Sequence, residues 1–245
     1  MSGTNRHAER LAGWAERGRV DTPPQPAATV VLVRDREAVL ETLLLRKNSR
    51  IAFGGMWVFP GGRVDVEDRG AGVGDELAAE RRAAVREAHE ETGLVVGEEE
   101  LVPFSHWTPP PIAPRRYRTW FFVARAPEAV VSIDGGEIHE HAWLRPADAL
   151  VRRDAGGIEL APPTFVTLHE LAQHESVEAT LAHARSRTPE LFATVIARVD
   201  GGAVAMWHGD AGYEDGVPDR PGARHRLWML DRGWRYERRA HGGTR

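Results

Sequence analysis

Three carboxylates crowd little more than one turn of a predicted helix, and this crowding constrains the fold more than any other feature. They belong to the stretch REAHEETGL, residues 86–94, and are Glu87, Glu90 and Glu91. At about 100° per residue, the three share a helix face about 100° wide. Like charges at this spacing repel one another. Either a cation binds among them, or the face is solvated with Arg82 and Arg86 as surface partners.

The helix itself is predicted to begin near Asp75, which suits the N-cap, and to end at Gly93, which suits the C′ position. Small or apolar residues occupy the arc beside the acidic face. They are Leu77, Ala84, Val85, Ala88 and Thr92. We therefore expect this helix to pack one face against a sheet and to leave the carboxylates at the edge of that contact.

Strands are predicted before and after this helix in the sequence, from β-branched and leucine-rich runs bounded by Gly and Pro. Their ranges are 27–35, 38–47, 56–62, 101–107, 117–125, 129–133, 138–144, 191–199, 203–207, 225–233 and 234–239. Further helices are predicted at 4–18, 146–154, 162–176 and 175–186, two of them opened by proline. The pattern indicates an α+β fold.

The chain divides into three predicted parts. Residues 1–26 are an N-terminal helix followed by a Pro-rich linker. Residues 27–189 form the main domain, and residues 190–245 form a β-rich extension packed on it.

Composition excludes several classes of protein. The chain has 245 residues and no cysteine, which rules out disulfides and thiolate chemistry. The net charge of −4 provides no basic field for nucleic acid. No apolar run reaches the ~20 residues that span a bilayer, and the first residues lack the apolar core of a secretory signal. We expect a soluble, cytoplasmic protein without nucleic-acid or membrane partners.

Two segments, FPGGRVDVED and AAVREAHEETGL, resemble the Nudix box of the Nudix hydrolases. The family pattern is G-x5-E-x7-R-E-U-x-E-E-x-G-U, where U is aliphatic. The residues that match are Gly62, Arg86, Glu87, Ala88, Glu90, Glu91, Gly93 and Leu94. The resemblance implies a Nudix fold, a mixed β-sheet sandwiched between helices, with extra helices and strands at the C-terminal end.

The middle of the box departs from the pattern. Five residues separate Gly62 from Asp68, which stands where the family has Glu, and 17 residues separate Asp68 from Arg86. An insertion of about ten residues follows from the two spacings. Candidates for the first Glu position are Asp68, Glu67, Glu76 and Glu80. We favour Asp68, because GGRVDVED resembles the GGRxDxxD form of coenzyme A-directed Nudix enzymes.

Other segments resemble one branch of the family. SHWTPPPIAPRRYRTWFFVARAP, GGEIHEHAWLRPADAL and a terminal strand pair are similar to the acyl-CoA diphosphatase-like branch. The resemblance implies metal-dependent hydrolysis of a P–O–P bond in a nucleoside diphosphate linked to another group, with CoA or acyl-CoA favoured. The alternatives are an ADP-ribose, NDP-sugar or dinucleotide pyrophosphatase, and a Nudix-fold nucleotide sensor without turnover.

The resemblance also implies roles for the box residues. Glu87, Glu90 and Glu91 would hold Mg²⁺ or Mn²⁺, together with a backbone carbonyl at Gly61 or Gly62. Glu87 is also a candidate base for the attacking water, and Arg86 would orient the glutamates.

A more distant glutamate serves as the base in some Nudix enzymes. The candidates here are Glu137 and Glu140, and the alternative is that both are solvated loop carboxylates. Arg115, Arg116 and Arg118 follow a proline run, where they would grip a diphosphate or the 3′-phosphate of CoA, or form a solvated cluster.

Arg63 is a further residue expected to bind the substrate, a small-molecule nucleoside diphosphate. The oligomeric state stays open between a monomer and a homodimer. Trp228, Trp234 and Tyr236 suit either the core of the C-terminal strands or a dimer contact.

Overall fold

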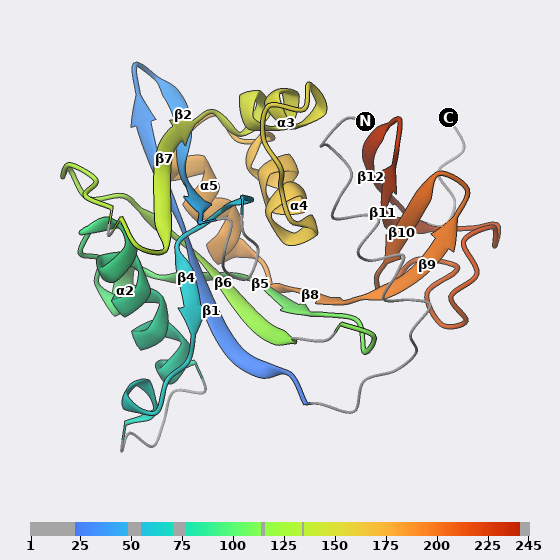
Figure 1. The fold of residues 1–245 in the computed structure, drawn as a ribbon, viewed down its shortest axis with the longest axis horizontal. Coiled ribbons are helices and arrows are strands. Elements are labelled where there is room, and N and C mark those ends of the chain that lie inside the picture. Colours follow the sequence, from blue (N-terminus) through green and yellow to red (C-terminus); the bar gives the residue numbers. More distant parts are fainter. Residues whose placement is uncertain (1–22, 49–54, 71–76, 114–115, 134, 241–245) are drawn as a thin grey trace.

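A mixed sheet with helices on both faces forms the centre of the molecule (Figure 1). The computed structural model describes residues 23–48, 55–70, 77–113, 116–133 and 135–240. Within these residues, helix α2 covers one face of the first sheet and helices α3 to α5 cover the other. A second, four-stranded sheet stands beside it. The predicted α+β fold, with extra strands at the C-terminal end, is confirmed.

The first sheet has eight strands among the described residues, six of them in the order β3-β2-β1-β6-β5-β8. Strand β4 pairs with β1, and β7 pairs with β2. The pairs β1–β6 and β5–β8 are parallel, and the others are antiparallel. The bounds are β1 Gln25–Arg36, β2 Val39–Lys47, β3 Trp57–Val58, β4 Gly61–Arg63, β5 Val102–Thr108, β6 Tyr117–Arg125, β7 Ile138–Leu144 and β8 Glu190–Ala193.

The second sheet is antiparallel, in the order β12-β11-β10-β9. Its strands are β9 Val195–Val199, β10 Gly202–Met206, β11 Arg224–Leu230 and β12 Gly233–Arg239. The helices are α2 Ala78–Thr92, α3 Pro146–Asp154, α4 Pro162–Leu171 and α5 Val177–Ser186. None of the described helices is both long enough and apolar enough to cross a membrane.

Several predicted elements differ in the structure. Residues 129–133 form no strand, and Val130 is 90% exposed there. The predicted strand 56–62 is broken at Pro60, because proline has no N–H for the ladder, and Gly61 then starts β4 on a new partner. The predicted strand 191–199 divides at Thr194 between the two sheets. The predicted helix 162–176 ends at Leu171, and a second helix begins at Val177. The predicted helix 4–18 and Asp75 lie outside the described residues.

Each face of the first sheet has its own hydrophobic core. Alternation along β1 directs Val30 and Leu32 toward α2, and Val31 and Val33 toward the other helices. The core on the face covered by α3 to α5 continues into the C-terminal sheet. There the Trp107 ring stacks on Phe192, with ring centroids 3.8 Å apart, and meets Trp207 edge-on at 5.6 Å. The two sheets therefore share one packed core.

Candidate active site

Helix α2 presents its carboxylates to strand β4. Gly93 ends the helix with φ of 70°, and its N–H donates to the His89 carbonyl at 2.8 Å, as a left-handed C-terminal cap requires. Glu91, two residues earlier in the last turn of the helix, is only 4% exposed. Its Oε2 accepts a hydrogen bond from the Gly61 N–H at 2.9 Å, and its Oε1 accepts one from Lys47 Nζ at 3.1 Å. The end of the helix is thereby tied to β4 and to β2.

Burial raises the pKa of both Glu87 and Glu91 above the ordinary value for glutamate. Nearby positive charge only partly offsets this desolvation: Arg86 acts on Glu87, and Lys47 acts on Glu91. Keeping each carboxylate charged therefore costs desolvation free energy, and a further cation nearby would reduce that cost.

Arg86 lies at the centre of the acidic cluster. Its Nη1 donates to Glu87 Oε1 at 3.0 Å and to Glu90 Oε2 at 3.1 Å. Its Nε and Nη2 donate to the two carboxylate oxygens of Asp68, at 3.2 and 2.9 Å. One guanidinium therefore orients three carboxylates, in keeping with the fixed geometry of its donors.

Asp68 lies in a short 3-10 turn, η2 (Glu67–Arg69), and is buried. Burial alone would raise the pKa of Asp68, but hydrogen bonds from Arg86 and from the Asp65 N–H outweigh it and lower that pKa. Arg82 Nε also donates to the Asp68 carbonyl at 2.6 Å. Arg82 and Arg86 thus hold this turn against α2, rather than serving as partners on a solvated helix face.

The contacts discriminate among the candidates for the first Glu position. Asp68 meets Arg86, whereas Glu67 is exposed beside it. Glu80 is partly buried in the first turn of α2, and Glu76 lies outside the described residues. Among the candidates that the structure describes, Asp68 is the one that hydrogen-bonds to Arg86.

Gly62 brings the backbone of β4 close to Glu87. A Cβ atom at Gly62 would lie 2.2 Å from Glu87 Oε1, closer than real Cβ contacts allow. Any larger residue would displace this carboxylate, so the glycine leaves room for Glu87 in its present position beside β4.

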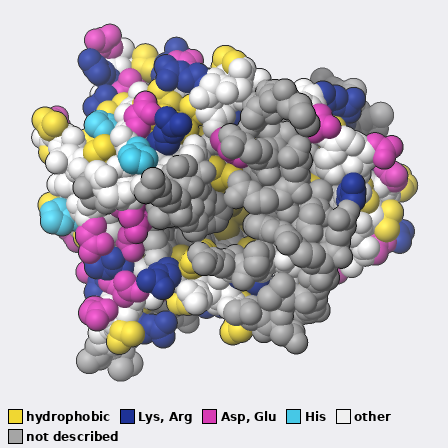
Figure 2. All heavy atoms as spheres, viewed as in Figure 1, with side chains coloured by type: hydrophobic (Ala, Val, Ile, Leu, Met, Phe, Trp, Pro, Cys, Tyr) yellow, Lys and Arg dark blue, Asp and Glu magenta, His cyan; other side chains and the backbone are white. Residues whose placement is uncertain are grey.

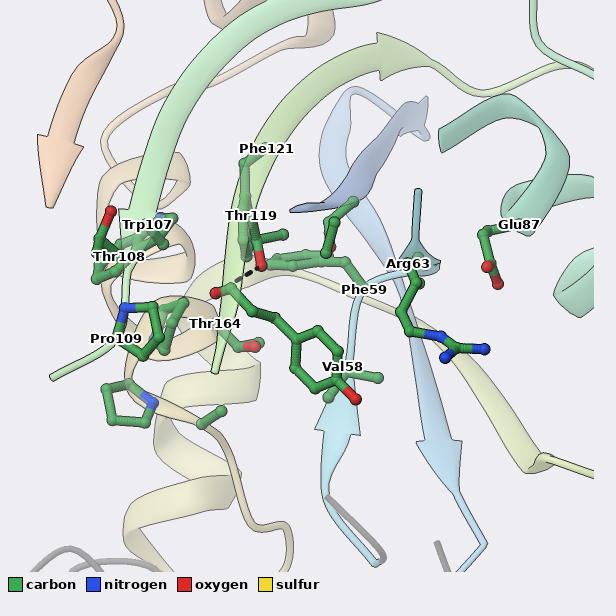
Figure 3. A pocket seen from close by; sticks show the side chains of 18 of the residues that line it. Val58, Phe59, Arg63, Glu87, Trp107, Thr108, Pro109, Thr119, Phe121 and Thr164 are labelled. Atoms are coloured by element: carbon green, nitrogen blue, oxygen red, sulfur yellow. Dashed lines mark hydrogen bonds between the residues drawn. The ribbon is translucent and has the colours of Figure 1, made fainter. Parts of the chain in front are cut away.

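A cavity of about 690 Å³ opens beside this cluster. In Figure 3, Arg63 and Glu87 lie on one side of it, and Phe59, Trp107, Pro109 and Phe121 lie on the other. The charged residues that line it are Lys47, Arg63, Asp65, Arg86, Glu87, Glu90, Glu91 and Glu137. The cavity is therefore acidic at one end and largely apolar at the other.

The predicted distal glutamates separate in the structure. Glu137 lines the cavity, and its Oε2 lies 3.8 Å from Lys47 Nζ. Glu140 lies on β7, where it pairs with Arg46 at 3.2 Å, and it is not among the described residues that line the cavity. His139 and His141, on the same strand, are exposed.

The predicted arginines separate as well. Arg63 lines the cavity, but Arg116 and Arg118 are absent from the described lining residues, and Arg115 lies outside the described residues. Side chains alternate between the two faces of the sheet along β6. Tyr117 and Thr119 face the cavity, so Arg118 faces the opposite side of the sheet. Arg116 Nη2 donates to the Pro109 carbonyl at 3.4 Å.

Sequence reasoning missed Lys47 as a site residue. It is the only lysine in the chain, and it stands at the end of β2 on the same face as Leu43 and Leu45, toward α2. Its side chain is 15% exposed and contacts Glu91 and Glu137. The combination of strand alternation and a single lysine could have identified it.

The chemistry of the donors fits a hard divalent cation. Five carboxylates and three cationic side chains line the described part of the cavity, so negative charge is in excess among its charged groups. Among the described residues, however, no three acidic or histidine side chains converge as a ready ligand set. Arg86 and Lys47 account for this, since they hold oxygens of Glu87, Glu90 and Glu91.

The surface over α2 carries charges of both signs. On the face seen in Figure 2, acidic and basic side chains alternate in this region, rather than forming a continuous patch of one sign.

Comparison with known proteins gives the following similarities. Residues 23–163 match the family described as the NUDIX domain. Among solved structures, a NUDIX hydrolase from Alicyclobacillus acidocaldarius is 21% identical, with a TM-score of 0.60 over 66% of this chain and 97% of that one. The NUDIX domain of Shewanella oneidensis NrtR, complexed with ADP ribose, is 20% identical over 68% and 96%, with a TM-score of 0.48. A C. elegans Ap4A hydrolase is 22% identical over 61% and 96%, with a TM-score of 0.41. No curated protein sequence matches the chain.

Proposed function

This chain belongs to the Nudix family of hydrolases, and from that premise we propose that it cleaves the P–O–P bond of a nucleoside diphosphate linked to another group. One observation carries the proposal. The three box glutamates of α2 and the glycine turn of β4 open together into one end of a cavity large enough for a nucleotide-sized molecule.

Glu87, Glu90 and Glu91 are the proposed ligands for Mg²⁺ or Mn²⁺, with a carbonyl of Gly61 or Gly62 as a further donor. Bound there, the ion would neutralise phosphate charge and lower the pKa of a water molecule. Arg86 supports this assignment, because it orients Glu87 and Glu90 and is itself fixed by Asp68.

Two residues are proposed as the base that takes the proton of the attacking water. Glu87 lies in the acidic cluster, and burial raises its pKa above the ordinary value, which makes it a stronger proton acceptor. Glu137 lines the same end of the cavity from the loop before β7. Arg63 lies at this end too, and is proposed to contact a substrate phosphate. Glu140 is left out, because it pairs with Arg46 outside the described lining.

CoA or acyl-CoA is the favoured substrate, and the apolar half of the cavity supports it. The arginine cluster gives this choice no support, since Arg116 and Arg118 are not among the described lining residues. The alternatives are hydrolysis of ADP-ribose, NDP-sugars or dinucleotides, and a sensor without turnover. Retention of Arg86 and all three helix glutamates argues for turnover.

A hydrolysis screen with Mg²⁺ or Mn²⁺ tests the proposal. The panel is CoA, acetyl-CoA, ADP-ribose, UDP-glucose, NADH and diadenosine polyphosphates, with products separated by chromatography. We expect 4′-phosphopantetheine from CoA to form faster than AMP from ADP-ribose. The opposite order would reject CoA as the preferred substrate, and nucleotide binding without any phosphate-containing product would indicate a sensor.

Glu90→Gln and Glu91→Gln test the metal ligands. Both variants should abolish turnover, because each removes one proposed ligand charge. Glu90→Gln is the cleaner test, since Glu90 is half exposed and its surface ion pair with Arg86 contributes at most about 1 kcal/mol to folding. Glu178→Gln is the matched control, because it removes a surface carboxylate of α5 that pairs with Arg125 of β6. Near-parent rates in either site variant would show that the metal assignment is wrong.

A further inference from the structure

The cavity extends beyond the part of the chain that matches the family. Residues 23–163 make the match, yet the cavity is also lined by Thr194, Ile196, Ala205 and Trp207. Ala205 and Trp207 are fully buried. Thr194 and Ile196 are only partly buried, so they are the C-terminal residues that can touch a ligand, and we call these four residues the C-terminal wall of the cavity.

This wall is held firmly in place. Strand β8 pairs with β5 in parallel, and the Thr194 N–H donates to the Thr108 carbonyl at 3.0 Å. Directly after Thr194, β9 begins the second sheet and pairs Ile196 with Ala205. The chain therefore passes from one sheet to the other at the cavity itself. Packing of Trp207 on Trp107 also ties the second sheet to β5.

The end of the cavity next to this wall has few polar groups. Among the described lining residues, every ionised side chain belongs to the α2 end. The polar side-chain groups of the far end are hydroxyls and the indole N–H groups of Trp107 and Trp207, which donate to Ser105 and Thr194. Two of the hydroxyls are engaged: Thr119 Oγ1 donates to the Tyr117 carbonyl at 3.4 Å, and Thr194 Oγ1 accepts from Trp207 Nε1 at 3.0 Å.

These surroundings favour one chemical class of ligand. A nucleobase placed here would lose water from several donors and acceptors without full replacement. A saturated acyl chain loses no hydrogen bonds and gains apolar burial.

We propose that the C-terminal sheet is the specificity wall of this site, and that Ile196 contacts a saturated acyl chain on the diphosphate substrate. The inference rests on the proposed function, since it assumes that the diphosphate binds at the acidic end. It assigns to residues 190–245 a part in substrate choice.

Calorimetry with two monophosphates tests the inference. The ligands are acetyl-4′-phosphopantetheine and octanoyl-4′-phosphopantetheine, each titrated with Mg²⁺ into the full chain. Neither contains a P–O–P bond, so the heat reports binding alone. We expect the octanoyl ligand to bind at least about tenfold more tightly, because several methylenes leave water.

Variants at Ile196 locate that preference. Ile196→Asp should remove it by placing a charge in the apolar end, and Ile196→Ala, which keeps the strand apolar, should reduce it several-fold. Val195→Asp is the matched control. Val195 is the preceding residue of β9, it is absent from the described lining, and its side chain approaches Gly216 instead. Urea unfolding of each variant separates loss of binding from loss of folding.

The outcomes are distinct. Equal affinity for the two ligands in the parent protein, no binding of either, or an unchanged preference in Ile196→Ala would overturn the inference. A clear preference for the octanoyl ligand that is lost in Ile196→Asp and kept in Val195→Asp would support the inference, even if the hydrolysis panel were negative. A negative panel would then count against the proposed hydrolysis alone.

Discussion

At the scale of single residues, Asp68 shows how one side chain supports a site from behind. It is buried, and it accepts hydrogen bonds from both Arg86 and the Asp65 backbone. Arg86 in turn orients Glu87 and Glu90. The geometry of the acidic face therefore depends on a carboxylate that does not itself line the described cavity.

Asp68→Asn should destabilise the protein by about 2 kcal/mol, since it leaves the partly buried Arg86 with a weaker, neutral partner. Turnover should fall at least about tenfold, because Glu87 and Glu90 lose their fixed orientation. Urea unfolding and initial rates measure the two effects. Asp65→Asn is the control for stability: that carboxylate lies 3.6 Å from Arg86 but is half exposed, so its loss should cost little. Equal losses in the two variants would contradict this account.

A second prediction at this scale concerns acid. Burial, with the nearby charge of Arg118, lowers the pKa of His106 below its ordinary value of 6.5. The unfolded chain therefore takes up a proton as pH falls below 6.5 while the folded chain does not, so stability is lost in that direction.

His106→Phe should reduce the acid loss of stability, because phenylalanine keeps the ring stacked on Trp120 and binds no proton. The benefit over the parent should grow as pH falls from 6.5, and unfolding in urea at several pH values measures it. His139→Phe, at an exposed position, is the control. A benefit that is constant with pH would show that His106 is not responsible.

At the scale of elements, strand β4 does more than its three residues suggest. Gly61 donates its N–H to Glu91, and Gly62 makes room for Glu87. The strand is held in turn by antiparallel pairing to β1. A short edge element therefore sets the position of two carboxylates on a separate helix.

The two glycines of β4 should respond differently to alanine. At Gly61, φ is +157° and a Cβ would lie 2.4 Å from the Ala28 carbonyl, so Gly61→Ala should cost about 1–3 kcal/mol of stability. At Gly62 the obstructing group is the Glu87 side chain, which can move. Gly62→Ala should therefore lower turnover with a smaller effect on stability. Thermal unfolding and rates compare them, and the reverse order would contradict this reading of β4.

At the scale of the whole molecule, the C-terminal sheet is part of the same core as the larger sheet. Trp107, Phe192 and Trp207 pack against one another, and Phe165 of α4 meets Trp234 of β12. We expect tryptophan fluorescence and far-UV circular dichroism to report one coincident unfolding transition.

Trp207→Ala should lower the free energy of unfolding by about 3–5 kcal/mol, since it empties the centre of the shared core. Leu191→Ala is the control, because Leu191 is 59% exposed on β8. Two separate transitions in the parent protein would contradict the shared core and indicate that residues 190–245 unfold on their own.

Local patterns in the sequence determined much of this protein. Apolar periodicity and a suitable cap predicted the acidic helix, and Gly93 does end it in the left-handed conformation. The strands 117–125 and 138–144 agree with β6 and β7 to the residue, because β-branched and aromatic runs bounded by turns are local signals. The motif likewise predicts Glu87, Glu90, Glu91 and Gly62 as site residues, and these four do line one end of the cavity.

Only the tertiary structure decided which distant residues join the residues of the motif at the cavity. Lys47 reaches Glu91 across 44 positions of sequence, and Ile196 lies on the same cavity as Glu87. Arg118 lies next to Tyr117 in sequence but on the other face of the sheet. The physical reason is that strand pairing and core packing depend on contacts between segments far apart in the chain, and no local pattern specifies those contacts.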